Sequence, residues 1–422
     1  MKKLIVLLLM LTAFWGCSKR KNPVEPRDTR GTLETGFINS AALDTSIIPQ
    51  ATGRSVYIYK PFDYNDTIGY DMTITPPIPP DTIPDTTYQA YAAAHDTPVL
   101  YLLHGYGGNY KYFPVLFDIK NILDEMISSG EIQPMVVILP DADNTFGGSF
   151  YADSPVDSAN FESFSGLFEA YFVDELMPYI SRYFNVDTMT AGRGISGHSM
   201  GGYGAYRLAM RHPGLFGSVS AMSAPTAFAG MLSLMPAVFA ENGFNPADTL
   251  VDGERSDSLI AIRDSIFYTI APASSKRVTS MMFAMGAAFS PHGLANPDTS
   301  LFHRIVRTTG FVGIDLPFRV DGMIDSAFWA EKWLANDVTT ILAGGGYAAL
   351  QGKALYIDCG NADDLGLQYQ NRGFDQALAA TGLTHIYVEY AGYPNAPGNH
   401  TRFVADRLRE VLKFHSQAFA NR

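Results

Sequence analysis

The chain has few residues that could cross-link it or hold a metal ion. Only two cysteines, Cys17 and Cys359, occur in 422 residues, which excludes a disulfide framework. No cluster of cysteine and histidine has the spacing of a structural zinc site. We therefore expect no metal and no cofactor, and we expect Cys359 to be either a buried thiol or a chance surface one.

Basic residues are also scarce. Thirty Lys plus Arg against forty-two Asp plus Glu give a formal charge of -12, the wrong sign for a protein that neutralises phosphates, so we expect no nucleic-acid partner. With 38 glycines, 25 prolines and 13% aromatic residues, the composition argues against a coiled coil or a disordered chain. The length allows two or three average domains or one large α/β domain with insertions.

The amino-terminal apolar run, Leu4–Trp15, is too short to span a bilayer as a helix. Two lysines precede it and a glycine followed by Cys17 ends it, which is typical of a secretory signal peptide and resembles a bacterial lipobox. We expect residues 1–17 to be a lipoprotein-type signal peptide with Cys17 as the lipid anchor, and 18–50 to be a tether and lead-in. The protein would then lie in the bacterial cell envelope or outside the cell, on the outer side of a membrane. A plain secretory signal is the alternative.

Strands and helices alternate over residues 51–422, which predicts a doubly wound, mostly parallel sheet in one α/β domain. Strands are expected at Ser55–Lys60, Pro98–Leu103, Met135–Leu139, Ala191–Ile195, Ala354–Cys359 and Ile386–Tyr390, and helices at 167–184, 204–212 and 401–418. A Pro-rich insertion at about 65–96 cannot be central strand. A helical cap insertion is expected at about 225–350.

The chemistry is expected at a serine. Gly197–Gly201 reads G-x-S-x-G between a strand and a helix, the setting of a nucleophile elbow, so Ser199 is the predicted nucleophile. A serine needs a histidine base and a carboxylate that orients the histidine. His400 follows the strand that ends near Tyr390, whereas His212, His385 and His415 lie in or beside regular elements. Asp363 and Asp364 both follow the strand that ends at Cys359; we prefer Asp363 and keep Asp364 as the alternative.

Two backbone amides are candidates for an oxyanion hole. The first is the N–H of Met200, the residue after the nucleophile. The second is the N–H of Tyr106 in the glycine-rich loop His104–Gly108, which follows a predicted strand. The alternative is that this loop is only a tight turn. We interpret His104 itself as structural.

Several segments together resemble the putative-esterase group of α/β-hydrolases. They are Leu102–Gly108, Tyr171–Ile180, Arg193–Ala205, Arg211–Phe216, Asp358–Asp363 and Gly398–His400. That group includes feruloyl and acetyl xylan esterases of carbohydrate esterase family 1, S-formylglutathione hydrolases and mycolyltransferases. The resemblance implies an α/β-hydrolase fold, with the nucleophile at Ser199, the acid at Asp363, the base at His400 and the oxyanion donors at Met200 and Tyr106.

The substrate side is less determined. Tyr151 lies in a segment that resembles a family loop near the acyl pocket, so it is a candidate substrate contact, with a structural role as the alternative. Met281, Met282 and Met285, with Trp329 or Trp333, could form an acyl pocket, but such spacing is more often cap core.

These observations favour an extracytoplasmic serine carboxylic-ester hydrolase that acts through an acyl-enzyme. Its expected partner is an ester substrate linked to plant polysaccharide, from which it would remove feruloyl or acetyl groups. One alternative is an acyltransferase of the mycolyltransferase type. Another is a catalytically silent surface binding protein on the same scaffold.

Overall fold

The computed structural model describes residues 30–64, 97–154, 162–243, 275–292, 301–307, 311–319 and 321–422. The predicted signal segment with Cys17, the first part of the tether and the Pro-rich insertion at about 65–96 lie outside the described residues. Among the helices of the described ranges, none is both long enough and apolar enough to cross a membrane.

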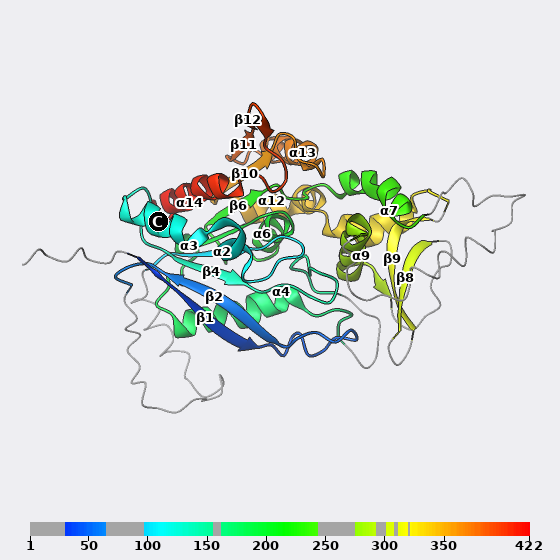
Figure 1. Cartoon of the computed structure of the whole chain (residues 1–422), viewed down its shortest axis with the longest axis horizontal. Helices are drawn as coiled ribbons and strands as arrows, with labels where there is room; N and C mark the ends of the chain where they lie inside the picture. Colours follow the sequence, from blue (N-terminus) through cyan, green and yellow to red (C-terminus); the bar gives the residue numbers. More distant parts are fainter. Residues whose placement is uncertain are drawn as a thin grey trace, which may run out of the picture.

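A sheet of eight strands forms the centre of the domain (Figure 1), in the order β1-β2-β4-β3-β5-β6-β10-β11. Its strands are β1 Thr32–Asn39, β2 Gly53–Lys60, β3 Val99–Leu103, β4 Val136–Pro140, β5 Arg193–Gly197, β6 Ser218–Met222, β10 Ala354–Gly360 and β11 Ile386–Tyr390. From β4 to β11 every neighbouring pair is parallel, and β1 and β2 are antiparallel to their neighbours. This is the α/β-hydrolase arrangement that the sequence predicts.

The central strands of the sheet are buried on both faces because helices cover each of them. In β3, Val99, Tyr101 and Leu103 belong to one buried cluster, whereas Leu100 and Leu102 belong to the other. The first face is covered by α5 Met177–Tyr183, α6 Met200–Arg211 and α13 Leu367–Ala380, and the second by α2 Tyr112–Phe117, α3 Ile119–Ser128 and α14 Val404–Ala420. Double burial explains why β3 and β4 read as continuous apolar runs.

Several short helices and a two-stranded ladder connect the strands of the sheet. The predicted helix at 167–184 is confirmed as α4 Phe168–Ala170, the π-helical η2 Tyr171–Leu176 and α5 in succession. A single turn, η3 Thr190–Gly192, precedes β5, and a small ladder of β12 Gly392–Tyr393 and β13 Ala396–Pro397 precedes His400.

The first strand, β1, lies inside the segment that we predicted as tether and lead-in. It pairs with β2 along its whole length, from Thr32 opposite Lys60 to Asn39 opposite Gly53. The predicted domain boundary at residue 51 is therefore too late. The signal was weak because only Gly36 and Ile38 of this edge strand are buried and Phe37 faces outward.

The cap is not purely helical, which corrects the prediction for residues 225–350. In its described parts a three-stranded antiparallel sheet of β7 Pro291–His292, β9 Phe311–Arg319 and β8 Leu301–Arg307 joins the helices. These helices are η4 Phe228–Leu234, α7 Met235–Glu241, α9 Arg277–Phe289, α10 Ser326–Phe328, η7 Trp329–Trp333, η8 Leu334–Asn336, α11 Val338–Ile341, η9 Leu342–Gly346 and α12 Tyr347–Leu350. In β9 the buried apolar residues Ile314, Leu316 and Phe318 alternate along the sequence with Asp315 and Pro317, a period-two signal that a purely helical interpretation overlooks.

A buried ion pair links α14 to β10 beneath the ends of the strands. Arg407 and Asp358 are almost completely buried, and the Arg407 Nε donates to Asp358 Oδ1 at 2.8 Å. The same guanidinium donates to Ser223 Oγ at 3.0 Å. Removing one partner of such a pair leaves an uncompensated buried charge.

We predict that Arg407→Met lowers the free energy of unfolding by about 3–5 kcal/mol, because Asp358 loses its counter-charge in the protein interior. Arg372→Met is the matched control, since it breaks the solvent-exposed Arg372–Glu389 pair and should change stability far less. Urea unfolding of the three proteins, followed by circular dichroism, measures the difference. Equal destabilisation by the two substitutions would contradict the prediction.

Candidate active site

A strained turn places Ser199 between β5 and α6. Its backbone lies at φ 56° and ψ -120°, a left-handed region that non-glycine residues rarely adopt. The neighbouring glycines have no room for a side chain: a Cβ on Gly197 would lie 2.3 Å from the carbonyl carbon of Gly201, and one on Gly201 would lie 2.0 Å from the Leu103 oxygen. The turn therefore requires the predicted G-x-S-x-G pattern, and it raises the Ser199 hydroxyl at the carboxyl end of the sheet.

Ser199, His400 and Asp363 lie in one hydrogen-bonded series. The Ser199 Oγ is 2.9 Å from His400 Nε2, and His400 Nδ1 is 2.8 Å from Asp363 Oδ2. Because a carboxylate only accepts, Nδ1 carries the proton and Nε2 is left to accept from the serine hydroxyl. The Asp363 side chain is completely buried. Burial opposes its ionisation, but hydrogen bonds from His400 and the Leu365 backbone hold the pKa of the Asp363 carboxyl below its usual value.

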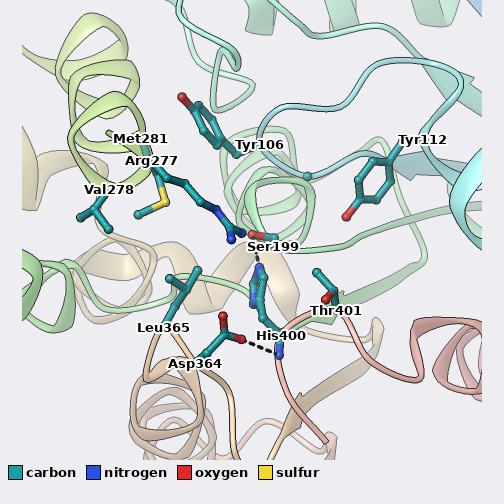
Figure 2. Close-up of a pocket in the computed structure, with 11 residues that line it drawn as sticks. Tyr106, Tyr112, Ser199, Arg277, Val278, Met281, Asp364, Leu365, His400 and Thr401 are labelled. Carbon is teal, nitrogen blue, oxygen red and sulfur yellow. Dashed lines mark hydrogen bonds between the residues drawn. The ribbon is translucent and has the colours of Figure 1, made fainter. Parts of the chain in front are cut away.

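The two neighbouring aspartates have different positions. Asp364 Oδ1 accepts a hydrogen bond from the backbone N–H of His400 at 3.2 Å, and no bond joins it to the imidazole ring (Figure 2). Asp363 contacts the ring and Asp364 contacts the main chain, so geometry favours Asp363 for orienting the base.

His198, to which the sequence analysis gave no role, holds the main chain of His400. Its Nε2 donates to the His400 carbonyl at 2.8 Å, because a carbonyl can only accept. Burial holds the pKa of His198 well below its usual value, so the ring is neutral and its Nδ1 accepts from the Tyr112 hydroxyl at 2.8 Å. The only sequence signal for this residue was its place directly before the nucleophile.

The two predicted oxyanion donors border Ser199. Met200 is the first residue of α6, where the N–H groups of a helix have no acceptor within the helix. Tyr106 lines the cavity above Ser199, and its side chain is held by donation from its hydroxyl to the Phe146 carbonyl at 3.2 Å. His104 is buried, with Nδ1 bonded to the Gly105 oxygen and Nε2 to the Ala142 N–H, which fits its predicted structural role.

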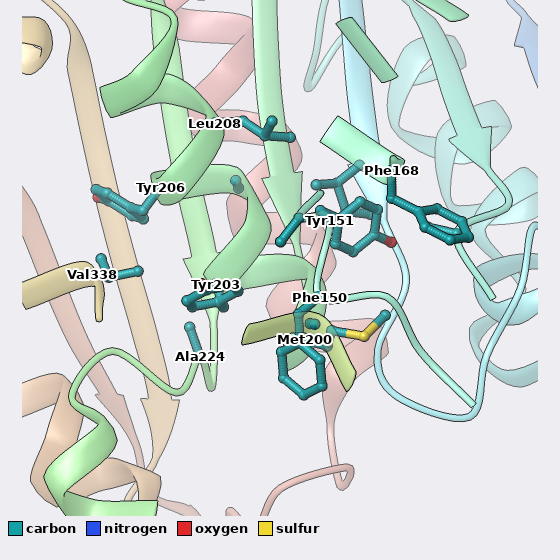
Figure 3. Close-up of a cluster of buried hydrophobic side chains, with 14 of the residues drawn as sticks. Phe150, Tyr151, Phe168, Met200, Tyr203, Tyr206, Leu208, Ala224 and Val338 are labelled. Atoms are coloured by element: carbon teal, nitrogen blue, oxygen red, sulfur yellow. The ribbon is translucent and has the colours of Figure 1, made fainter. Parts of the chain in front are cut away.

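Tyr151 does not reach the cavity, so the structure contradicts its candidacy as a substrate contact. It is completely buried among hydrophobic side chains (Figure 3), and its hydroxyl donates to the His104 carbonyl at 3.1 Å. A Cβ on Gly204 would lie 2.6 Å from its ring, which shows how tightly α6 packs on it. The preceding residue, Phe150, lines a pocket beside Ser199 instead.

Two hollows meet at Ser199. The larger, of about 280 Å³, is lined by Gly105, Tyr106, Tyr112, Ser199, Arg277, Val278, Met281, Asp364, Leu365, His400 and Thr401. The smaller, of about 10 Å³, is lined by Tyr106, Phe150, Ser199, Met200, Pro225, Met231, Met281, Leu365 and Leu367 and is mainly apolar. The first turns of α9 supply Arg277, Val278 and Met281 to these hollows, and of these three the sequence analysis considered only Met281.

The tryptophans of the cap line neither hollow. Trp333 is buried and its Nε1 donates to Ser290 Oγ at 3.0 Å, and Trp329 stacks on it with ring centroids 6.0 Å apart. They are cap core, the more common of the two roles left open for them. Within the described ranges no three His, Cys, Asp or Glu side chains form a group that could hold a metal ion.

Segments of this chain are similar in sequence to known proteins. A segment of 134 residues is 33% identical to an endo-1,4-beta-xylanase/feruloyl esterase of Xylanibacter ruminicola, covering 31% of this chain and 17% of that protein. A segment of 165 residues is 27% identical to an acetyl esterase of Caldicellulosiruptor saccharolyticus, covering 38% of this chain and 53% of that protein. The aligned region is thus less than two thirds of either relative.

Solved structures with a similar fold are also known. A ferulic acid esterase structure superimposes with a TM-score of 0.50 at 19% sequence identity, over 93% of this chain and 100% of that one. A family model described as Putative esterase matches residues 84–403. Because this match covers more than half of the sequence, the chain belongs to the putative-esterase family.

Proposed function

We propose that the protein is a serine carboxylic-ester hydrolase that works through an acyl-enzyme. The observation that carries the proposal is the hydrogen-bonded series Ser199–His400–Asp363 at the edge of a cavity. Such a series supplies a nucleophile, a base within hydrogen-bond reach and a group that orients the base. Its completeness also argues against a catalytically silent binding protein.

In this proposal the reaction has two steps, formation and hydrolysis of the acyl-enzyme. His400 Nε2 takes the Ser199 proton as Oγ attacks the ester carbonyl. The N–H groups of Met200 and Tyr106 donate hydrogen bonds to the carbonyl oxygen, which becomes negatively charged. His400 then gives the proton to the departing alcohol. A water molecule, deprotonated by the same Nε2, attacks the acyl-enzyme, and Ser199 regains its proton as the acid leaves. Asp363 stays ionised and stabilises the imidazolium formed in each step.

The small apolar hollow is the acyl site in this proposal, because it lies beside both Ser199 and Met200. Its volume of about 10 Å³ is comparable to the space that one water molecule needs. An acetyl methyl group suits such a space, whereas a feruloyl ring would require Met231 and Met281 to move. Both are flexible thioether side chains that repack readily. Of the two acyl groups named above, acetyl fits the hollow as it stands.

The natural substrate in this proposal is an acylated plant polysaccharide outside the cytoplasm. The larger cavity is open enough to receive a sugar, and two relatives are named for feruloyl and acetyl ester hydrolysis. The envelope location rests on the sequence pattern that ends at Cys17.

The test of the activity compares the wild-type protein with Ser199→Ala on methyl ferulate and acetylated xylan, with ferulate and acetate release as readouts. We expect Ser199-dependent release, with acetate favoured, because the alanine variant has no nucleophile. Transfer of the acyl group to an added sugar in place of water would favour the acyltransferase alternative. Release that persists in Ser199→Ala would contradict the proposal.

Asp363→Asn should lower kcat by about 10⁴-fold, because an amide cannot hold the His400 tautomer as a carboxylate does. Asp364→Asn is the matched control and should change kcat little, since Asp364 contacts only the main chain of His400. Kinetics with a small aryl acetate measure both, and circular dichroism verifies folding. A large loss in Asp364→Asn together with a small one in Asp363→Asn would reverse the assignment of the acid.

Cys17→Ser should move the protein, expressed in a bacterial host, from the detergent phase of a phase-partition experiment to the aqueous phase, because the lipid anchor is lost. Cys359→Ser is the control, since Cys359 is buried and free and should not affect partition. Mass spectrometry of the amino-terminal peptide identifies the acyl groups. Unchanged partition of Cys17→Ser would leave no basis for a lipid anchor at this residue.

A further inference from the structure

The larger cavity contains a cation that the catalytic steps do not use. Arg277 begins α9 in the cap, and its side chain extends across the cavity toward Ser199 (Figure 2). Burial raises the pKa of Tyr112 to about 12. The positive charges of Arg407 and Arg277 oppose that rise. Arg277 and Tyr112 both line this cavity.

No ion pair or hydrogen bond joins Arg277 to another part of the chain that the structure describes. The carboxylate at the same end of α9, Glu241, is engaged elsewhere. It accepts from the backbone N–H groups of Val278 and Thr279 at 3.0 and 2.7 Å and from the Thr279 hydroxyl at 2.7 Å. These bonds fix the backbone beside Arg277, and Glu241 forms no ion pair with the guanidinium among the described residues.

Asp364 also lines the cavity, and its carboxylate is bonded to the main chain of His400 and not to Arg277. The cavity is therefore bipolar, with a cation on the cap and an anion on the β10–α13 loop. A negatively charged substrate group would be drawn toward Arg277 and kept away from Asp364.

Arg277 lines the larger cavity and not the small apolar hollow. In the proposed mechanism the apolar hollow holds the acyl group, so the larger cavity holds the alcohol that His400 protonates. A guanidinium forms two parallel hydrogen bonds with a carboxylate, a pairing that ammonium groups do not reproduce. The cation thus lies on the alcohol side of the scissile bond.

We propose that the substrate is an ester whose alcohol portion carries a carboxylate near the acylated hydroxyl, as in an acylated acidic sugar, and that Arg277 binds this carboxylate. The inference rests on the proposed ester hydrolysis and narrows its substrate class. Arg277 is then a specificity-determining residue: it touches the substrate and leaves the chemical step to Ser199 and His400.

The experiment compares kcat/KM for two acetate esters that differ in one charge, 4-acetoxybenzoate and its neutral methyl ester, with the full-length wild-type protein and Arg277→Gln. We expect Arg277→Gln to lower kcat/KM for 4-acetoxybenzoate about tenfold or more, through KM, since a hydrogen bond to a charged group contributes about 1.5–3 kcal/mol. The methyl ester should change less than about threefold. Arg277→Lys should retain part of the preference, and added salt should reduce the preference in the wild type and in Arg277→Lys but not in Arg277→Gln.

Two controls separate the sources of an effect. Arg402→Gln removes one positive charge from the exposed segment after His400 without altering the lining of either hollow, so it should leave the preference intact. 4-Nitrophenyl hemisuccinate, which carries its carboxylate on the acyl side, should be hydrolysed slowly and equally by the wild type and Arg277→Gln, because the small apolar hollow does not suit a charged acyl group. A dependence there equal to that for 4-acetoxybenzoate would overturn the assignment of the carboxylate to the alcohol.

The outcomes distinguish this inference from the activity itself. Ser199-dependent hydrolysis of the methyl ester with no Arg277-dependent preference for the carboxylate would overturn the inference and leave the esterase proposal standing. Failure of the wild-type protein to hydrolyse either acetate, together with no release from methyl ferulate or acetylated xylan, would overturn the proposed activity, and the inference with it.

Discussion

The strained backbone at Ser199 is the constraint on which the site depends. A non-glycine residue at φ 56° costs on the order of 1–3 kcal/mol, and it persists only where the surroundings over-determine it. Here three strands do so: His198 N–H bonds to the Leu103 oxygen of β3, Ser199 N–H bonds to the Met222 oxygen of β6, and β5 leads directly into the turn. The result is a hydroxyl and an adjacent amide with fixed directions, which is what a nucleophile beside an oxyanion donor requires.

The proposed base, His400, is on a loop, and the loop is held at several points. Asp363 orients the imidazole, Asp364 bonds the backbone N–H of His400, and His198 bonds its carbonyl. Beneath them, Gly360 at the end of β10 lets the His400 loop approach so closely that a Cβ there would lie 2.4 Å from the Gly398 oxygen. The position of the base therefore depends on backbone packing as well as on its carboxylate partner.

Sequence patterns predicted the parts of the protein that local rules govern. Apolar runs predicted the buried strands β3 and β4, and G-x-S-x-G between a strand and a helix predicted the turn at Ser199, whereas the buried strand β6, which contains Ser218 and Ser220, was not predicted. They could not predict what tertiary packing decides. β1 has too few inward apolar residues to be seen as a strand. Tyr151 is buried and the preceding residue, Phe150, lines the pocket beside Ser199, at a turn where both residues have positive φ. Arg277 enters the cavity from a different region of the chain, which no local pattern records.

The residues of the site therefore come from two parts of the fold, the sheet and the cap. The proposed catalytic residues come from turns and loops at the carboxyl ends of sheet strands, whereas Arg277, the cation in the cavity lining, comes from a helix of the cap, which has its own core around Trp333. The net charge of -12 does not cancel this cation, because exposed charges more than about 10 Å away are largely screened at ordinary salt concentrations. A single cap arginine can therefore make the cavity of an acidic protein attractive to an anion, and a change in the cap could alter substrate choice without disturbing the turn at Ser199.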